Sequence, residues 1–386
     1  MPIQFIDLNA QQQRIRDAVL RNITRVLDHG QYIMGPEIRE LEEKLAGYVG
    51  TRYAVSCSSG TDALLMALMA YGAGPGDAIF TSPFTFVATA EVISLLGATP
   101  VFVDIEPDTF NIDPMKLEQA VDALEKKDPG IHPLPRGFEG LRPKGIIPVD
   151  LFGQPADYDA INALAQKKGL FVIEDAAQSF GAGYKGKKAC ALADVAATSF
   201  FPAKPLGCYG DGGMVFTDDS ALYEHLTSVR VHGKGSDKYD NIRIGINGRC
   251  DTLQAAILLA KLEIFPEEMD LRQEVAGRYT DALRSSGDIQ TPQVKDGRLS
   301  AWAQYSLVSG KKEDILDALK KAGIPTAIYY PKPLHLQGAY TYLGYKPGDC
   351  PVSEITAGKI FSLPMHPYLT KEEQQKITDV ILGAVS

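Results

Sequence analysis

The positions of apolar and polar residues along the chain predict two kinds of element in a regular order. Residues 15–28 and 37–48 carry apolar side chains three or four positions apart, the period of a helix that buries one face. After residue 50, short apolar runs typical of buried strands alternate with helical segments. Strands are predicted at 53–57, 79–81, 100–103, 146–149, 170–173 and 214–217, and helices at 62–71, 87–96, 115–124, 157–168 and 221–231. This alternation predicts an α/β fold with a mostly parallel central sheet and helices on both faces.

The last part of the chain has a different pattern. A helical run at 251–262 leads into a charged helix that ends near residue 284. The elements predicted beyond it are strands at 302–308 and 326–330, a helix at 312–321 and a final helix from about residue 371. Because strands and helices no longer alternate as βα units, we expect a smaller α+β domain. The predicted division is a large domain of residues 1–250, which includes the N-terminal helices, and a small C-terminal domain of residues 251–386.

Composition excludes several classes of function. The 386 residues carry a formal net charge of −9, which argues against a nucleic-acid partner because such a partner needs a basic patch. No apolar run approaches the length of a membrane span, and the segment MPIQFIDLNAQQQRIR lacks the apolar centre of a secretion signal. The five cysteines and six histidines are scattered without ligand spacing, so we predict no metal site. We expect a cytoplasmic protein with reduced thiols and no membrane contact.

One lysine has unusual neighbours in the sequence. Lys204 lies in the segment SFFPAKPLGCYGDGG (199–213), between two prolines and after two phenylalanines, and the next charge is Asp211. A partly buried amine on such a tight loop would have a lowered pKa and a free electron pair for Schiff-base chemistry. An ordinary loop lysine whose amine reaches solvent would also fit this window.

Two other segments supply complementary chemistry. The turn Ser58-Ser59-Gly60-Thr61 lies between a strand and a helix, where free N–H groups and the helix dipole attract an anion. Asp175 follows the strand at 170–173, at the sheet edge where parallel α/β folds bind ligands. Each feature is also explained by simple helix capping. Together with Lys204, however, they match the phosphate, the pyridine nitrogen and the aldehyde of pyridoxal phosphate.

Ten motifs in sequence order resemble the DegT/DnrJ/EryC1/StrS family of sugar aminotransferases, within fold-type I of the pyridoxal-phosphate enzymes. The resemblance covers nearly the whole chain and implies a fold-type I structure with a smaller C-terminal α+β domain. The motifs are FIDL, GQYIMGPEI, SSGTDAL, FTFVATAE, PVFVDIEPDTFNIDP, IEDAAQSFGAGYKGK, SFFPAKPLGCYGDGG, RVHG, NGRCDTLQAA and SLPMHP.

The resemblance implies a role for each cofactor-binding residue. Lys204 matches the lysine that holds the cofactor covalently and then moves the proton between the cofactor carbon and the substrate carbon. Asp175 matches the carboxylate on the pyridine nitrogen. The remaining matches are Gln178 beside the phenolic oxygen, Phe86 stacked on the ring, Gly60, Thr61 and Ser199 at the phosphate, and Asn247 at the phosphate of the neighbouring subunit. The role of Asn247 implies a homodimer with shared active sites. Taken singly, Phe86 could be a core residue, Gln178 a surface amide and Ser199 a strand-end hydroxyl.

The family resemblance also implies the reaction. Members move an amino group from L-glutamate to the ketone of a nucleotide-linked sugar, whereas related dehydratases have histidine at the lysine position, so Lys204 favours transamination. The segments SFFPAKPLGCYGDGG, NGRCDTLQAAILLAKLEIF and SLPMHPYL most resemble the branch that aminates C3 of a UDP-3-keto-N-acetylglucosaminuronate for surface polysaccharide. In that branch, Arg249 could pair with the uronate carboxylate.

The chain departs from the family pattern at two places. The family segment HYPxPLH reads YYPKPLH here, so that Tyr329 replaces a histidine; we expect Tyr329, Tyr330 and His335 to line the sugar pocket. The segment at about 126–144 is rich in Pro and Gly and longer than the family's usual connection. We expect it to decorate the surface rather than cover the substrate.

Three alternatives stay open at this point. A C4 aminotransferase acting on a UDP- or dTDP-4-keto-6-deoxy sugar would share every cofactor residue. A regulatory protein on the same fold would bind cofactor or sugar without turnover. A nicotinamide dehydrogenase is supported only by the glycines at 207–213, which do not follow the fingerprint spacing.

Overall fold

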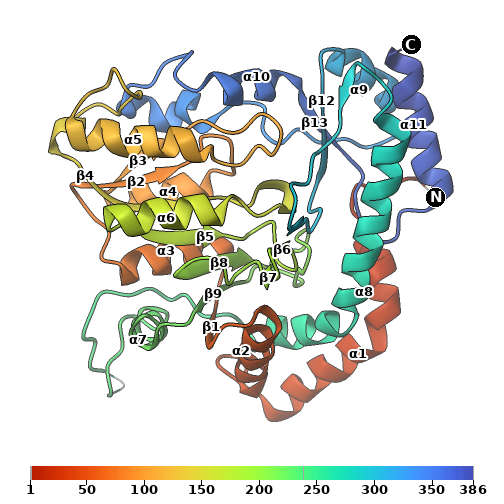
Figure 1. Ribbon diagram of the computed structural model, residues 1–386. Helices are drawn as coiled ribbons and strands as arrows, with labels where there is room; N and C mark the ends of the chain where they lie inside the picture. Colours follow the sequence, from red (N-terminus) through yellow and green to blue (C-terminus); the bar gives the residue numbers. More distant parts are fainter. Residues whose placement is uncertain (1, 238, 386) are drawn as a thin grey trace.

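The computed structural model describes residues 2–237 and 239–385, and a seven-stranded sheet lies at its centre (Figure 1). Its order is β1-β9-β8-β5-β4-β2-β3. β9 runs antiparallel to both neighbours, and the other six strands run in one direction. The strands are β1 (Tyr53–Cys57), β2 (Asp77–Thr81), β3 (Thr99–Phe102), β4 (Arg142–Ile147), β5 (Phe171–Asp175), β8 (Val195–Ser199) and β9 (Gly213–Thr217). The prediction of a mostly parallel sheet is confirmed.

Helices cover both faces of this sheet, as the alternation of apolar runs predicts. Successive strand residues point to opposite faces, so that Ile146 packs with the helices on one side and Ile147 with those on the other. One face carries α3 (Gly60–Ala70), α4 (Ala88–Leu95) and α7 (Ser220–Val229), and the other carries α2 (Pro36–Val49), α5 (Pro114–Lys126) and α6 (Tyr158–Lys168). The strands are buried on both faces, which explains their continuous apolar runs.

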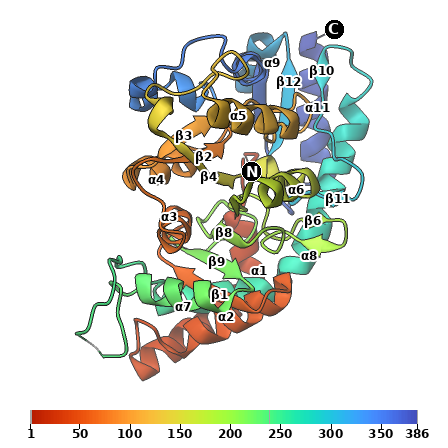
Figure 2. The same ribbon diagram turned by 60° about the vertical axis from the view of Figure 1, so that its left-hand side comes forward.

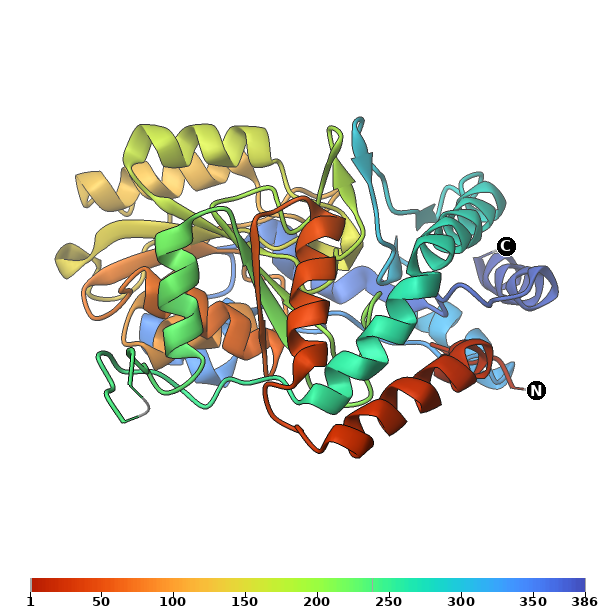
Figure 3. The same cartoon turned by 90° about the horizontal axis from the view of Figure 1, so that it is seen from below.

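A single long helix, α8 (Thr252–Leu283), links two apolar cores. The sequence predicts a helical run and then a charged helix; the structure has one helix with Pro266 inside it, and its direction changes along its length (Figure 1). Its first half packs in the core with the central sheet, and its second half packs with the C-terminal elements. α1 (Leu8–His29) lies beside α8 (Figure 3). The division after residue 250 stays a prediction.

The C-terminal elements form a small antiparallel sheet with flanking helices. The sheet order is β10-β12-β13. These elements are β10 (Ile289–Gln290), β12 (Tyr305–Ser309), α9 (Lys312–Lys321), α10 (Pro351–Lys359), β13 (Ile360–Leu363) and α11 (Lys371–Val385). The predicted strand at 326–330 is wrong, because there the ladder is limited to an isolated bridge between Ala327 and Ser362. Prolines at 325 and 331 flank the segment and lack the N–H that a longer ladder requires.

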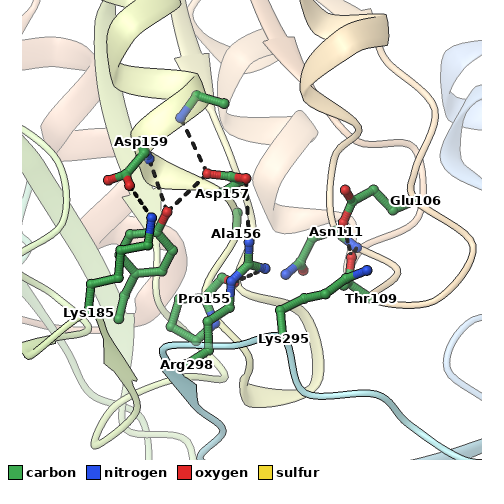
Figure 4. A network of polar contacts seen from close by, with 12 residues as sticks. Glu106, Thr109, Asn111, Pro155, Ala156, Asp157, Asp159, Lys185, Lys295 and Arg298 are labelled. Carbon is green, nitrogen blue, oxygen red and sulfur yellow. Dashed lines mark hydrogen bonds and ion pairs between the residues drawn. The ribbon is translucent and has the colours of Figure 1, made fainter.

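Hydrogen bonds and ion pairs join the segment at 290–299 to loops of the large sheet (Figure 4). β11 (Arg298–Leu299) pairs with β6 (Gly183–Tyr184), which pairs with β7 (Lys187–Lys188). The guanidinium of Arg298 donates to the Pro155 carbonyl oxygen at 3.0 Å and lies 3.7 Å from an Asp157 carboxylate oxygen. Lys295 and Asp108 form a second ion pair between the same regions. Segments far apart in the sequence are therefore held together beside the carboxyl edge of the sheet.

The segment rich in Pro and Gly is shorter than expected and packs on the C-terminal half. β4 begins at Arg142, inside the predicted excursion, and Arg142 forms an ion pair with Asp77. The backbone N of Arg136 donates to the Leu343 carbonyl oxygen at 2.7 Å, next to the 3-10 helix Gly338–Leu343. The ring of His132 is bonded to the Phe102 carbonyl oxygen at 2.9 Å. The segment thus covers the end of β3, at the edge of the sheet farthest from β1.

Within residues 2–237 and 239–385, the helices are too short or too polar to cross a membrane.

Candidate active site

Lys204 lies on a tightly folded loop between β8 and β9. The backbone N of Phe200 donates to the Gly212 carbonyl oxygen at 2.7 Å, and the N of Lys204 donates to the Phe201 carbonyl oxygen at 2.9 Å. A Cβ at Gly207 would lie 2.6 Å from the carbonyl oxygen of Pro202, so only glycine fits where the chain folds back. The cluster of glycines after the lysine therefore serves this turn and does not form a nucleotide fingerprint.

Lys204 and Asp175 interact electrostatically at the carboxyl edge of the sheet. Removal from bulk water lowers the pKa of the Lys204 amine, and the negative charge of Asp175 opposes this shift. Burial raises the pKa of Asp175, whereas its hydrogen bonds and the nearby lysine act in the opposite direction. Asp175 ends β5, and Lys204 lies on the loop that follows the adjacent strand β8.

The carboxylate of Asp175 is buried, and each of its two oxygens accepts a hydrogen bond. Thr89 on α4 donates from Oγ1 to Asp175 Oδ2 at 2.7 Å, and the backbone N of Ala177 donates to Oδ1 at 3.2 Å. Residues 177–181 form a turn rather than a helix, so Asp175 does not cap a helix. Sequence reasoning did not assign a role to Thr89; its place one turn after Phe86, within FTFVATAE, was the available signal.

The predicted phosphate turn lies directly against the strand that precedes Lys204. Ser59 caps α3 by accepting from the Asp62 N at 3.0 Å, so the capping interpretation of this turn is confirmed and its role at a phosphate stays a prediction. A Cβ at Gly60 would lie 2.6 Å from the Cβ of Ser199, which shows how closely the two segments approach. Gly60, Thr61 and Ser199 are all partly exposed. Backbone and hydroxyl donors from two segments therefore meet at the positive end of a helix.

Gln178 is buried and joins two parts of the site. Its Oε1 accepts from the Phe152 N at 2.7 Å, and its Nε2 donates to the Tyr330 hydroxyl at 3.2 Å. The ring of Tyr330 packs edge-on against Phe84, with 6.1 Å between centroids. A predicted cofactor residue and a predicted sugar residue are thus in direct contact, and Gln178 is not a surface amide.

Phe86 is 56% exposed, which excludes the alternative of a core residue. It lies just before α4, and the Phe86 carbonyl oxygen accepts from the Thr89 N at 3.3 Å. Because Thr89 also bonds Asp175, the aromatic face and the buried carboxylate belong to one local structure.

Asn247 and Arg249 lie side by side before α8. Arg249 Nε donates to Asn247 Oδ1 at 2.9 Å, and Asn247 is exposed. Both line a cleft of about 620 Å³ that also contains Ser58 and Ser59. The segment between α7 and α8, described at 232–237 and 239–246, projects from the body of the chain and leads along the sequence to Asn247 (Figure 2).

The two other predicted sugar residues lie in different surroundings. Tyr329 is partly exposed and packs near Phe5, with 6.5 Å between ring centroids. His335 is only 1% exposed, and its Nε2 lies 3.1 Å from Glu354 Oε1 on α10. The structure therefore gives the buried His335 a partly exposed carboxylate as its partner, and the role of His335 at the sugar stays a prediction.

All five cysteines are buried and unpaired. Over the described ranges, 2–237 and 239–385, His, Cys, Asp and Glu side chains do not gather in threes that could hold a metal ion.

Comparison with known proteins identifies the family. The model of the DegT/DnrJ/EryC1/StrS aminotransferase family matches residues 13–382. The chain belongs to this family. A crystal structure of a DegT/DnrJ/EryC1/StrS aminotransferase from Brucella abortus is 50% identical and superposes with a TM-score of 0.94 over 100% of both chains. The resemblance inferred from the ten motifs and the α/β fold-type I prediction are confirmed.

Two curated members of the DegT/DnrJ/EryC1/StrS family carry different descriptions. The UDP-2-acetamido-2-deoxy-3-oxo-D-glucuronate aminotransferase of Pseudomonas aeruginosa is 52% identical over 367 residues, which cover 95% of this chain and 96% of that protein. A pleiotropic regulatory protein of Geobacillus stearothermophilus is 42% identical over 383 residues, which cover 99% and 98% of the two chains.

Proposed function

We propose that this chain is a pyridoxal-phosphate aminotransferase that moves the amino group of L-glutamate to C3 of a UDP-linked 3-keto-N-acetylglucosaminuronate. The observation that carries this proposal is the Lys204–Asp175 pair, at the edge of the sheet beside the turn at 58–61. The 52% identity to an aminotransferase of this substrate class supports the choice of sugar. We further propose a cytoplasmic location, which the sequence favours.

The residues present fit the cofactor. Because Gly60 has no Cβ, Ser199 approaches it closely, and N–H and hydroxyl donors of the two segments lie together where a phosphate would bind. Phe86 offers an exposed ring face, and Asp175 offers a buried carboxylate whose other contacts are neutral donors. When bound, pyridoxal phosphate supplies an electron sink for the carbanion that forms at the substrate carbon.

The chain's own groups then position and move protons. Lys204 Nζ, whose pKa is lowered by burial, is suited both to hold the cofactor and to accept and return a proton. Asp175 would keep the pyridine nitrogen protonated, because a buried carboxylate favours a neighbouring positive charge. Thr89 and the Ala177 N fix the two carboxylate oxygens, so the carboxylate cannot rotate away.

Arg249 is the group that we propose for the sugar's carboxylate. Its guanidinium is partly exposed, lines the cleft and is oriented by Asn247. A guanidinium can bind a carboxylate through two parallel hydrogen bonds, which would favour a uronate over a neutral sugar. Tyr329 and Tyr330 are proposed to line the other side of this pocket.

A second copy of this chain is the partner that we propose for the surface around Asn247. Apolar side chains there are exposed to an unusual degree, among them Ile33 (45%), Ile242 (57%) and Ile244 (86%). Ile33 lines the same cleft as Asn247 and Arg249. Such a patch, next to a segment that projects from the body, favours a homodimer in which Asn247 reaches the partner's phosphate site.

The first experiment is an absorbance spectrum of the purified protein before and after addition of L-glutamate. We expect a visible band from the lysine-bound cofactor, its loss on addition of glutamate, and its absence in Lys204→Ala. A panel of UDP-linked 3-keto and 4-keto sugars then measures release of 2-oxoglutarate. A protein without the band, even with added pyridoxal phosphate, refutes the cofactor assignment. A band without turnover on any sugar would favour a regulatory role, and preference for a 4-keto sugar would move the reaction to C4.

Mixed dimers test whether Asn247 acts across the interface. Lys204→Ala and Asn247→Ala would each be strongly impaired alone. If Asn247 serves the partner's site, a mixed dimer of the two variants has one fully intact site and regains about half of the wild-type activity. If Asn247 acts within its own chain, every site in the mixture is defective and activity stays low, which refutes the shared site.

A further inference from the structure

A largely buried ion pair lies beside β1, the edge strand of the central sheet that leads into the turn at 58–61. Glu42 on α2 and Arg230 at the end of α7 make contact through Oε1 and Nη1, and their side chains are 15% and 7% exposed. Neither residue belongs to the site described above. Their contact joins two helices that are far apart in the sequence.

The pair satisfies both backbone groups of one residue on the edge strand. Ser56 in β1 faces Met214 in β9, at a position where its N–H and C=O point away from the ladder. The N and Oγ of Ser56 donate to Glu42 Oε1 at 2.9 and 2.7 Å. Arg230 Nη1 donates to the Ser56 carbonyl oxygen at 3.1 Å. The ion pair therefore takes the place of a further strand beside β1.

The backbone of Arg230 extends this contact to a second segment. The Gly248 N donates to the Arg230 carbonyl oxygen at 3.0 Å, and the Ser58 N donates to the Gly248 carbonyl oxygen at 3.1 Å. Ser58 begins the proposed phosphate turn, and Gly248 lies between Asn247 and Arg249. One arginine thus contacts β1 two residues before the turn and also holds the segment that carries Asn247.

The ion pair of Glu42 and Arg230 is better suited to position the neighbouring segments than to stabilise the fold. Arg230 Nε is buried, and among the described residues it has no hydrogen-bond partner. Buried ion pairs with incomplete hydrogen bonding add little to stability, because desolvation offsets the attraction between the charges. We propose that Glu42 and Arg230 are positioning residues that hold the turn at 58–61 in register with the segment at 247–249. This inference rests on the proposed function, since the register would set the affinity for the cofactor's phosphate.

The test compares Arg230→Met and Glu42→Gln with Lys168→Met as a matched control. Lys168 forms a partly buried ion-pair cluster with Asp122 and Glu125, between α6 and α5 and away from both segments. In Arg230→Met we expect the dissociation constant of pyridoxal phosphate to rise about 10- to 100-fold, the loss that follows removal of a residue that orients a binding group. The visible band of the holoenzyme measures this constant. The rise should be smaller in Glu42→Gln, and Lys168→Met should match the wild type. With saturating cofactor, kcat should stay within about threefold.

Amide hydrogen exchange provides a readout that needs no cofactor. Exchange at Ser58 and Gly248 should accelerate together in both variants and stay unchanged in Lys168→Met. If Arg230→Met does not fold, Glu42→Gln, which keeps the side-chain shape, decides the question. Unchanged exchange and unchanged cofactor affinity in folded Glu42→Gln would overturn the inference. A wild-type protein without the lysine-bound band would refute the proposed function instead, while the coupled exchange would still test the positioning.

Discussion

The residues predicted for the cofactor and those predicted for the sugar lie in different kinds of structure. Asp175 and Ser199 end adjacent parallel strands, and Gly60 begins the helix that follows another strand. Tyr329 and Tyr330 lie on an irregular segment after α9, and His335 lies in the 3-10 helix Leu334–Leu336, where it is buried against Glu354. Strand register fixes the first group relative to one another, whereas the second group depends on side-chain contacts and on isolated backbone bonds such as that from the Leu334 N to the Pro83 carbonyl oxygen. Substitutions at the cofactor residues should therefore change the reaction rate. Substitutions at the sugar residues should in part change the free energy of unfolding.

Substitution of Asp175 should give the largest effect. Asp175→Asn keeps the shape and the Thr89 bond but removes the negative charge beside the proposed pyridine nitrogen. We expect kcat for the glutamate half-reaction to fall about 10²- to 10³-fold, the magnitude seen when one preorganised electrostatic contact is lost. Stopped-flow absorbance of the visible band measures this rate. Asp159→Asn, which removes a carboxylate from an exposed side chain, is the control and should match the wild type. A rate within threefold of the wild type in Asp175→Asn would remove the carboxylate from the mechanism.

His335 should affect stability rather than sugar binding. His335→Leu removes the 3.1 Å contact with Glu354 and leaves that carboxylate without one of its partners. We expect the free energy of unfolding to drop by about 1–3 kcal/mol, measured by urea denaturation. Glu354→Gln should lose a similar amount. The KM for the keto-sugar should change by less than twofold; a tenfold rise in KM at unchanged stability would instead place His335 in the sugar pocket.

Tyr330 should give a smaller effect that reaches both half-reactions. Tyr330→Phe removes one of the two hydrogen bonds that orient the Gln178 amide. A loss of about 1 kcal/mol corresponds to a roughly fivefold decrease in kcat/KM, and we expect it for glutamate and for the sugar alike. Tyr329→Phe should alter only the sugar reaction. If Tyr330→Phe leaves glutamate turnover unchanged, the contact between Tyr330 and Gln178 has no role at the cofactor.

The same difference explains what the sequence could predict. Periodicity located the central strands and helices, because strands that are buried on both faces read as apolar runs. It did not locate the segment at 326–330 correctly, since apolar character there serves packing against Phe84 and Ile360 rather than a ladder. The motifs singled out Lys204 and Asp175 as cofactor residues, whereas Thr89, Glu42 and Arg230 make contacts between distant segments. Apart from the place of Thr89 within FTFVATAE, the single sequence carries no sign of such contacts.

The pH dependence of stability probes the buried groups behind Asp175. Asp150 accepts from the Tyr158 hydroxyl at 2.9 Å and the Ser179 hydroxyl at 2.7 Å, and its backbone N donates to the Asp175 carbonyl oxygen at 3.1 Å. Burial raises the pKa of Asp150 to about 6 and also raises the pKa of the neighbouring Glu174. The folded state therefore holds a proton that the unfolded chain releases above about pH 4.

Folding stability should consequently fall as the pH rises from about 4 to about 6, by at most about 1.4 kcal/mol per pH unit for each such group. Asp150→Asn has no proton to lose, so its unfolding free energy, from urea denaturation at pH 4.5, 5.5 and 6.5, should decrease less steeply than that of the wild type. Equal slopes would show that Asp150 is already ionised in the folded protein. In that case Asp150, whose backbone N is bonded to Asp175, would carry a buried charge. The position of Asp175 would then be fixed less firmly than the strand register suggests.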